Sequence, residues 1–247
     1  MNIFIVVVLV VGTFLLVYFN INLRKIKRNK LLEAPTNPKW KSFFELNVTF
    51  FKSLDDNQKE VFLQWVNVFL NEKRITPIET TITEEDRLLV AASAIIPVFA
   101  FPYYTYPNLK EVLIYPHHFD ANYSLEGDGR NILGMVGTGP MEGKMILALS
   151  ALRYGYKNDN DKHNVGIHEF IHLLDKQDGE TDGLPKILLE NKMIAPWIEI
   201  VHKETEHIFK HKSDINPYGA TNRAEFLAVI GEYFFESPEV LKKKHPE

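Results

Sequence analysis

The chain has 247 residues, of which 45% are hydrophobic and 24% are charged. This length supports one substantial hydrophobic core with an appendage, rather than two large domains. Cysteine is absent, which excludes a disulfide framework, a thiol nucleophile and any cysteine-ligated zinc or iron–sulfur site. A bound metal must therefore be held by histidine and carboxylate side chains.

The formal net charge of −4 conceals an uneven distribution of charge along the chain. Five of the 28 basic residues lie between Arg24 and Lys30, and no acidic residue precedes Glu33. From residue 31 onward the chain carries 23 basic and 32 acidic residues. Because nucleic-acid binding needs a clustered basic surface that contacts phosphates, we expect no nucleic-acid partner.

The N-terminal segment is long and apolar enough to cross a membrane. Residues 1–23 carry no charged side chain, and about 20 apolar residues in a helix span the core of a bilayer. A cleaved signal peptide would carry its basic residues before the apolar run, whereas here they follow it. By the positive-inside rule, the basic cluster lies on the cytoplasmic side. We predict a single-pass anchor at residues 1–23 of a cell-membrane protein whose remaining chain is cytoplasmic. The alternatives are a buried core helix and a basic arm for nucleic acid.

The next segment, residues 24–39, is expected to be a basic juxtamembrane segment and linker, because a polar stretch with Pro35 and Pro38 follows the basic cluster. Residues 40–247 then form one folded domain. Apolar residues at helical spacing predict packing helices over residues 57–71 and 84–96.

Two short apolar runs, at residues 112–115 and 145–149, predict buried strands of a small sheet. Five glycines between residues 127 and 139 predict a loop between these strands. The loop leads into a strand rather than a helix, which disfavours a phosphate-binding site. The expected fold class is α+β, mostly helical with a small sheet.

His168, Glu169 and His172 form the pattern H-E-x-x-H. Residues four apart lie on the same face of a helix, so both imidazoles can bind one metal ion about 2 Å from each ring nitrogen. Glu169 lies beside them, where its carboxylate can take a proton from an attacking water. The flanking sequence favours a helix, because Asn164 suits the N-cap and four apolar residues form a stripe: Ile167, Phe170, Ile171 and Leu174. The alternative is a helix with two partly exposed histidines and a solvated glutamate.

A catalytic zinc needs a third protein ligand and one open position. The candidate is Glu225, in a second predicted helix that begins after Asn222. The same spacing makes a capping box without any metal, so spacing alone leaves both interpretations open. Asp175, one turn after His172, is the rival ligand, although hydrogen bonding to a ligand imidazole suits its carboxylate better. Glu232 could support an imidazole in the same way, or could be an ordinary surface residue.

Three stretches of the chain resemble the Mlc titration factor A family of zinc peptidases: residues 164–175, 182–185 and 218–235. The resemblance implies a zincin-like fold related to the catalytic domain of anthrax lethal factor. It implies that His168, His172 and Glu225 hold zinc and that Glu169 is the base. It also implies that Tyr218 stabilises the oxyanion of the tetrahedral intermediate, whereas Tyr218 taken alone would be a turn aromatic. The apolar N-terminal segment is not part of the family pattern.

These patterns together predict a membrane-anchored zinc metallopeptidase that hydrolyses peptide or protein substrates. The substrate is expected along an edge strand of the small sheet, with residues 145–149 as that strand. The resemblance also implies a partnership with a transcriptional repressor. The second hypothesis is therefore a membrane-tethered regulator that sequesters such a repressor with little turnover.

Four further histidines are weaker candidates for the site. His207 and His211 are four apart on an expected helix, but they lack the intervening acid of the H-E-x-x-H pattern, and nearby lysines favour a solvated face. His117 and His118 follow the strand at residues 112–115 and could line the cleft.

Overall fold

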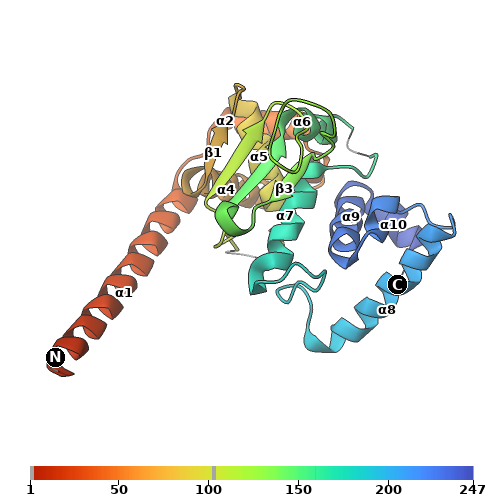
Figure 1. Ribbon diagram of the computed structural model, residues 1–247. Helices are drawn as coiled ribbons and strands as arrows, with labels where there is room; N and C mark the ends of the chain where they lie inside the picture. The colour runs from red at the N-terminus through yellow and green to blue at the C-terminus, as the bar shows by residue number, and fades with distance from the viewer. Residues whose placement is uncertain (1–2, 102–103, 159, 247) are drawn as a thin grey trace.

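The computed structural model describes residues 3–101, 104–158 and 160–246. Figure 1 shows a small sheet surrounded by helices, a long N-terminal helix that projects from this body, and a group of C-terminal helices beside α7. The strands are β1 (Arg74–Pro77), β2 (Glu111–Tyr115), β3 (Gly134–Val136) and β4 (Lys144–Ala148). The α-helices are α1 (Ile3–Glu33), α2 (Pro38–Asn47), α3 (Thr49–Lys52), α4 (Asp56–Glu72), α5 (Glu84–Ile95), α6 (Leu149–Lys157), α7 (Val165–Asp175), α8 (Asn191–Phe209), α9 (Arg223–Glu236) and α10 (Pro238–Lys244). Short 3-10 turns are η1 (Ile96–Val98), η2 (Gly139–Met141), η3 (Lys176–Asp178) and η4 (Pro217–Ala220).

The sheet is mixed, with its strands in the order β1-β2-β4-β3. Strands β1, β2 and β4 run parallel to one another, and β3 runs antiparallel to β4. Every residue of β2 is buried, because both faces of the sheet are covered. Val112 and Ile114 belong to the main core, whereas Leu113 and Tyr115 pack with Phe119 on the opposite face. The predicted α+β class, the two predicted helices and the two predicted strands are confirmed.

The edge of the sheet differs from the prediction. Residues 145–149 do not provide the edge strand, because β4 lies between β2 and β3. The edge strand next to β4 is β3, inside the glycine-containing segment for which the sequence predicted a loop. Pairing with β4 holds this segment extended: the N–H of Ala148 donates to the carbonyl of Leu133, and the N–H of Gly137 donates to that of Lys144. Three residues are too few to show the alternating apolar pattern of a strand. The pairing with β4, rather than the local sequence, therefore determines that β3 forms.

Helix α7 lies at the centre of the domain, in contact with α5 and α9. Glycines allow both neighbours to approach closely. A Cβ atom on Gly166 would lie 2.1 Å from Oγ of Ser93 in α5, and one on Gly231 of α9 would lie 2.1 Å from Cδ1 of Ile171. These two approaches fix α7 in the packed interior between elements that are distant in sequence.

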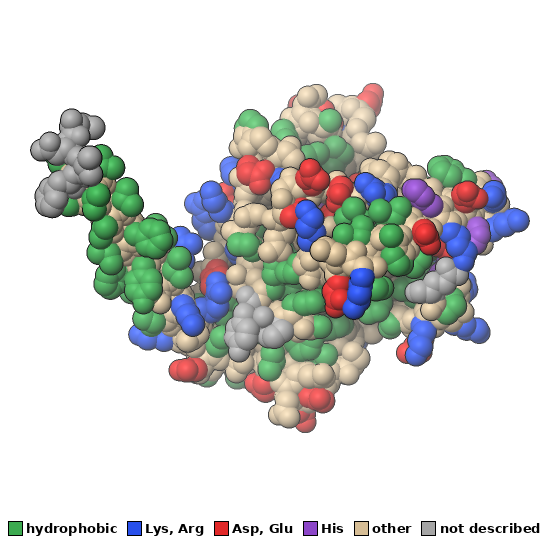
Figure 2. All heavy atoms as spheres, turned by 90° about the horizontal axis from the view of Figure 1, so that it is seen from below, with side chains coloured by type: hydrophobic (Ala, Val, Ile, Leu, Met, Phe, Trp, Pro, Cys, Tyr) green, Lys and Arg blue, Asp and Glu red, His purple; other side chains and the backbone are tan. Residues whose placement is uncertain are grey.

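Helix α1 is continuous through the apolar segment and the basic cluster. Its large apolar side chains between Ile5 and Ile26 are 48–78% exposed. Figure 2 shows them along the projecting helix, with Lys and Arg side chains near its base. Among the described residues this is the one helix that is long and apolar enough to cross a membrane.

The base of α1 is docked on α4. Arg28 donates to both carboxylate oxygens of Glu72, at 2.8 and 3.0 Å, and the side-chain amide of Asn67 donates to the carbonyl of Leu31 at 2.9 Å. The basic segment is therefore helical and packed against the domain. Residues 34–37 alone form the non-helical connection to α2.

Candidate metal centre

Helix α7 forms because its first turn is capped and its length is buried. Oδ1 of Asn164 accepts the N–H of Ile167 at 3.1 Å, which satisfies one of the free donors at the start of the helix. Residues 166–175 are all buried. After α7 and η3, Gly179 adopts a φ of 105°, a left-handed conformation that ends helices and favours glycine. The H-E-x-x-H residues therefore lie on a helix, as their pattern requires.

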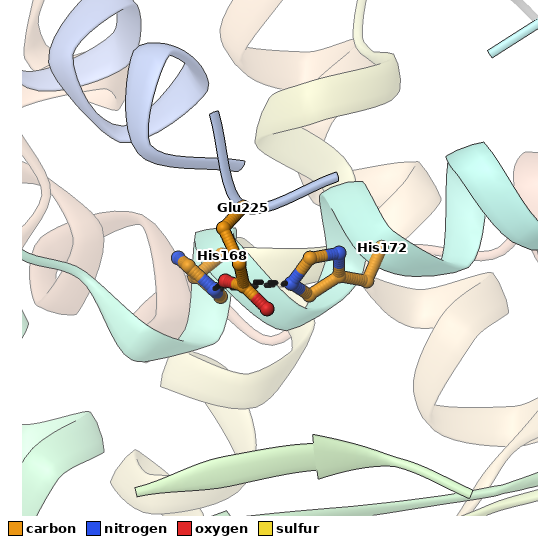
Figure 3. A group of neighbouring side chains, drawn as sticks. All are labelled: His168, His172 and Glu225. Atoms are coloured by element: carbon orange, nitrogen blue, oxygen red, sulfur yellow. Dashed lines mark hydrogen bonds and ion pairs between the residues drawn. The ribbon is translucent and has the colours of Figure 1, made fainter. Parts of the chain in front are cut away.

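His168, His172 and Glu225 point toward one another, although Glu225 lies 57 residues after His168 (Figure 3). Nε2 of His168 lies 3.0 Å from Oε2 of Glu225 and 3.1 Å from Nε2 of His172. Nε2 of His172 lies 3.4 Å from the same carboxylate oxygen. Asn222 does cap α9, since its Oδ1 accepts the N–H of Glu225 at 3.0 Å. That cap uses the backbone of Glu225 and leaves its carboxylate facing the two imidazoles.

The dimensions of this group fit a tetrahedral metal site. Bonds of about 2.0–2.1 Å to zinc, at tetrahedral angles, separate neighbouring ligand atoms by about 3.3 Å. The three observed separations are 3.0, 3.1 and 3.4 Å. Two imidazoles and a carboxylate are a ligand set of catalytic zinc, which keeps its fourth position open. Within the part of the chain that the structure describes, no other set of three His, Asp or Glu side chains is gathered in this way.

Glu232 of α9 forms a hydrogen bond with His168 of α7. Its Oε1 accepts a hydrogen bond from Nδ1 of His168 at 2.7 Å, and its Oε2 accepts the backbone N–H of Asn164 at 2.5 Å. The bond to Nδ1 leaves Nε2 of His168 directed at Glu225 and His172. A carboxylate in this position orients a ligand imidazole and increases its basicity.

Asp175 makes a different contact from the predicted one. Its Oδ2 accepts the N–H of Gly183 at 2.8 Å, so it holds the loop that follows α7. Its Oδ1 and Nδ1 of His172 are both buried, and neither has a hydrogen-bond partner among the described residues. Burial raises the pKa of Asp175 above its usual range, although the hydrogen bond from Gly183 opposes this.

Hydrogen bonds within this group shift the pKa values of His168 and Glu225 in opposite directions. Burial alone would lower the pKa of His168, but hydrogen bonds to Glu225 and Glu232 outweigh burial and raise this pKa to about 10. Burial raises the pKa of Glu225, whereas the bonds to His168 and His172 dominate and lower it to about 2. Glu225 therefore presents a negative charge to Nε2 of His168 and Nε2 of His172. A divalent cation bound between these three atoms would displace the proton of His168.

Glu169 is buried beside the group formed by His168, His172 and Glu225. It is 5% exposed, and burial raises the pKa of its carboxyl, with His168 and His172 opposing the rise. Its side chain packs against the start of β3. A Cβ atom on Gly134 would lie 2.5 Å from Cγ and 2.7 Å from Oε1 of Glu169, so only glycine leaves room at this point. No local pattern in the sequence marks Gly134, because its contact with Glu169 depends on β3 lying next to α7.

Tyr218 comes to the same cleft from η4. Its ring centroid is 6.0 Å from that of His168, and its side chain is 53% exposed. Partial burial of the hydroxyl, together with the carboxylates of Glu225 and Glu169, raises the pKa of Tyr218 above its usual value. The phenol therefore keeps its proton at neutral pH and can donate it in a hydrogen bond.

Of the weaker histidine candidates, only one comes near the centre. His118 lines the cleft together with His168 and Glu169, whereas His117 is not among the lining residues. The expectation that His207 and His211 share a helix is wrong, because α8 ends at Phe209 and His211 has a left-handed φ of 55°. His207 instead contacts Glu204 through Nδ1 at 3.2 Å.

Comparison with known proteins gives the family. The family described as glucose-regulated metallo-peptidase M90 matches residues 23–247, so the match begins after the apolar part of α1. The Synechocystis sp. protein slr2042 is 29% identical over 230 residues, which cover 89% of this chain and 83% of that protein. Mlc titration factor A of Escherichia fergusonii is 29% identical over 238 residues, with coverage of 88% and 85%. That of Pectobacterium atrosepticum is 27% identical over 219 residues, with coverage of 82% and 80%. The chain therefore belongs to the M90 metallopeptidase family, which confirms the resemblance to Mlc titration factor A.

Proposed function

We propose that this protein is a zinc-dependent peptidase anchored in the cell membrane. One observation carries the proposal: His168, His172 and Glu225 converge at the spacing of zinc ligands, and Glu169 lies beside them on the same helix. When bound there, zinc would lower the pKa of its water to about 7 and polarise the carbonyl of a substrate. The family match supports peptide bonds as the substrate class.

Glu169 is the group that moves protons in this proposal. Its carboxylate accepts a proton from the attacking water and returns it to the leaving amine. Burial supports this role, because it raises the pKa of the Glu169 carboxyl. The raised pKa lies closer to that of the water from which Glu169 would take a proton. Packing against Gly134 limits the positions open to the side chain.

Tyr218 is the group that stabilises negative charge. Its protonated phenol donates a hydrogen bond to the oxyanion that forms on the substrate carbonyl. A side chain half exposed on the 3-10 turn η4 can move toward the substrate when the cleft is filled. Glu232 acts one step away, by orienting His168.

The free edge of β3 is the binding surface for the substrate backbone. Residues 133 and 137 bond to β4, so by strand alternation the N–H and C=O groups of Gly134 and Val136 point to the open side. Two residues before Gly134, Ile132 exchanges two hydrogen bonds with Phe119, which ends the open edge. A peptide can therefore pair with Gly134 and Val136, beside Glu169.

The test uses full-length protein in detergent, because α1 is docked on the domain. We expect about one zinc per chain by elemental analysis and cleavage of quenched fluorescent peptides. Glu169→Gln should keep the zinc and lose at least about 100-fold in kcat/KM, because general-base catalysis contributes about 10²–10⁴-fold. A purified protein without metal, or a Glu169→Gln variant as active as the original, would contradict the proposal.

The location proposed is a single membrane span with the folded domain in the cytoplasm. The exposed apolar surface of α1 and the basic cluster that follows it support this orientation. We keep the division into an anchor at residues 1–23, a basic segment and linker at residues 24–39 and a peptidase domain at residues 40–247. Cysteine labelling from either side of the membrane, at single cysteines placed before Ile3 and after Glu236, would test the topology.

A second candidate function is binding without turnover. The name Mlc titration factor A describes titration of a partner, and several relatives carry it. A membrane-tethered protein of this kind could sequester a transcriptional regulator. The Glu169→Gln variant separates the two functions, because a cellular phenotype that survives this substitution favours binding over hydrolysis.

A further inference from the structure

The cleft around Glu169 has two lobes that differ in charge. Both reach Glu169, Gly134 and Tyr218. The Arg223 lobe, a cavity of about 680 Å³, is also lined by Val136, Thr138 and Arg223. The opposite lobe, of about 740 Å³, is also lined by Leu133, His163 and Asn216, and has no Lys or Arg among its described lining residues. A peptide crossing the centre therefore meets a permanent cation on one side only.

Among the described residues that line the Arg223 lobe, Arg223 is the cation that is free to bind a ligand. Lys176 also lines the Arg223 lobe, but its Nζ already contacts the carbonyl of Gly137 and the carboxylate of Glu142, both at 2.7 Å. Within the described parts of the chain, the guanidinium of Arg223 makes no ion pair, although Asp182 lines the same lobe. One oxygen of Asp182 accepts the N–H of Leu184 at 3.1 Å. An arginine remains charged at any physiological pH and offers a planar set of donors that matches a carboxylate.

The direction of β3 decides which end of a substrate meets Arg223. The strand runs from Gly134, beside Glu169, toward Val136, which lines the Arg223 lobe. Antiparallel pairing is the more stable arrangement per residue. A peptide paired in this way runs from Val136 toward Gly134, so its residues N-terminal to the scissile bond lie in the Arg223 lobe.

We propose that Arg223 selects peptides with an acidic side chain on the N-terminal side of the scissile bond. The inference rests on the proposed peptidase function and adds a substrate class to it. Arg223 contacts the substrate side chain and takes no part in the proton transfers. Hydrogen bonds to charged groups are worth about 10- to 100-fold in binding, which sets the expected size of the preference.

The experiment measures kcat/KM of the full-length zinc-loaded protein in detergent on four peptides that differ at single positions. The first pair differs by Glu or Gln at one position on the N-terminal side of the cleaved bond. The second pair differs by Glu or Gln at one position on the C-terminal side. We expect a Glu-to-Gln ratio of at least about 10 for the first pair and about 1 for the second. In Arg223→Gln the first ratio should fall to about 1, and in Arg223→Glu it should fall below 1.

Two controls accompany these variants. Arg74→Gln removes the same charge from β1, at the opposite edge of the sheet, and should keep both ratios. Arg223→Lys keeps the charge without the planar donors and should retain part of the preference, which also covers the case in which Arg223→Gln folds poorly.

The outcomes separate this inference from the function on which it rests. Equal cleavage of all four peptides by the original protein would overturn the role of Arg223 and leave the peptidase intact. A preference on the C-terminal side, or one that persists in Arg223→Gln, would overturn it as well. If none of the four peptides and no general protein substrate is cut while zinc is bound, the proposed function fails and this inference fails with it.

Discussion

Glu232 accepts a hydrogen bond from Nδ1 of His168 at 2.7 Å, across 64 residues of sequence. Its other oxygen accepts the backbone N–H of Asn164, the residue that caps α7. One carboxylate on α9 therefore fixes both the start of α7 and the orientation of the His168 ring. Through it, the docking of α9 on α7 controls the geometry of the candidate metal centre.

We expect Glu232→Gln to weaken zinc binding by about 10- to 100-fold, because loss of an orienting carboxylate typically has this effect. Competition with a fluorescent zinc chelator would measure the change. Glu236→Gln is the matched control, since Glu236 lies one turn further along α9 and contacts the N–H of His163 rather than a metal-binding ring. Equal zinc affinity in Glu232→Gln and the original protein would show that this hydrogen bond is not needed.

Zinc affinity should rise with pH. In the metal-free protein the pKa of His168 is raised to about 10, so the imidazole holds a proton that zinc must displace. Below that pKa, each unit of pH should increase log K by about one. Isothermal titration between pH 6.5 and 8.5, in buffers of different ionisation enthalpy, would report both the affinity and the proton released. A flat affinity over this range would mean that His168 is neutral before zinc binds.

Glu236 should destabilise the fold at alkaline pH. Burial raises the pKa of its carboxyl to about 8, from an ordinary value of 4.5. Between these values the folded chain holds a proton that the unfolded chain has lost, so stability is highest below pH 4.5 and falls as the pH rises to 8. Glu236→Gln should therefore increase the free energy of unfolding at pH 8.5 by at least about 1 kcal/mol. For a chain of this size, that gain corresponds to a rise in Tm of roughly 2–4 °C. At pH 4.5 the two proteins should melt together, and a Tm difference of equal size at both pH values would contradict the linkage.

Gly134→Ala should reduce catalysis more than it reduces stability. The added Cβ would meet Glu169 at 2.5 Å, and displacement of a catalytic base by about 1 Å can cost about 100-fold in rate. Zinc content should be unchanged, because the three atoms nearest to the added Cβ all belong to Glu169. The measurement is kcat/KM with Tm and zinc content on the same sample. Full activity in Gly134→Ala would show that β3 and Glu169 are not packed against each other during catalysis.

Local signals in the sequence were sufficient for several elements. The helical spacing around residues 57–71 and 84–96, the apolar runs that became β2 and β4, and the cap at Asn164 all depend on neighbours within one or two turns. The four-residue spacing of His168 and His172 also places both imidazoles on one face of α7. These features follow from backbone geometry, so no knowledge of the distant chain was needed.

The tertiary structure decided the rest. The sequence could not distinguish Glu225 as a metal-binding group from Glu225 in a capping box, because both need the same spacing from Asn222; packing of α9 on α7 through Gly231 turns its carboxylate toward the imidazoles. Tertiary contacts also place Asp175 against Gly183 rather than an imidazole. In the sheet, they place β3 rather than β4 at the edge. Local chemistry determined which residues could bind a metal, whereas contacts between segments far apart in the chain determined which of them meet.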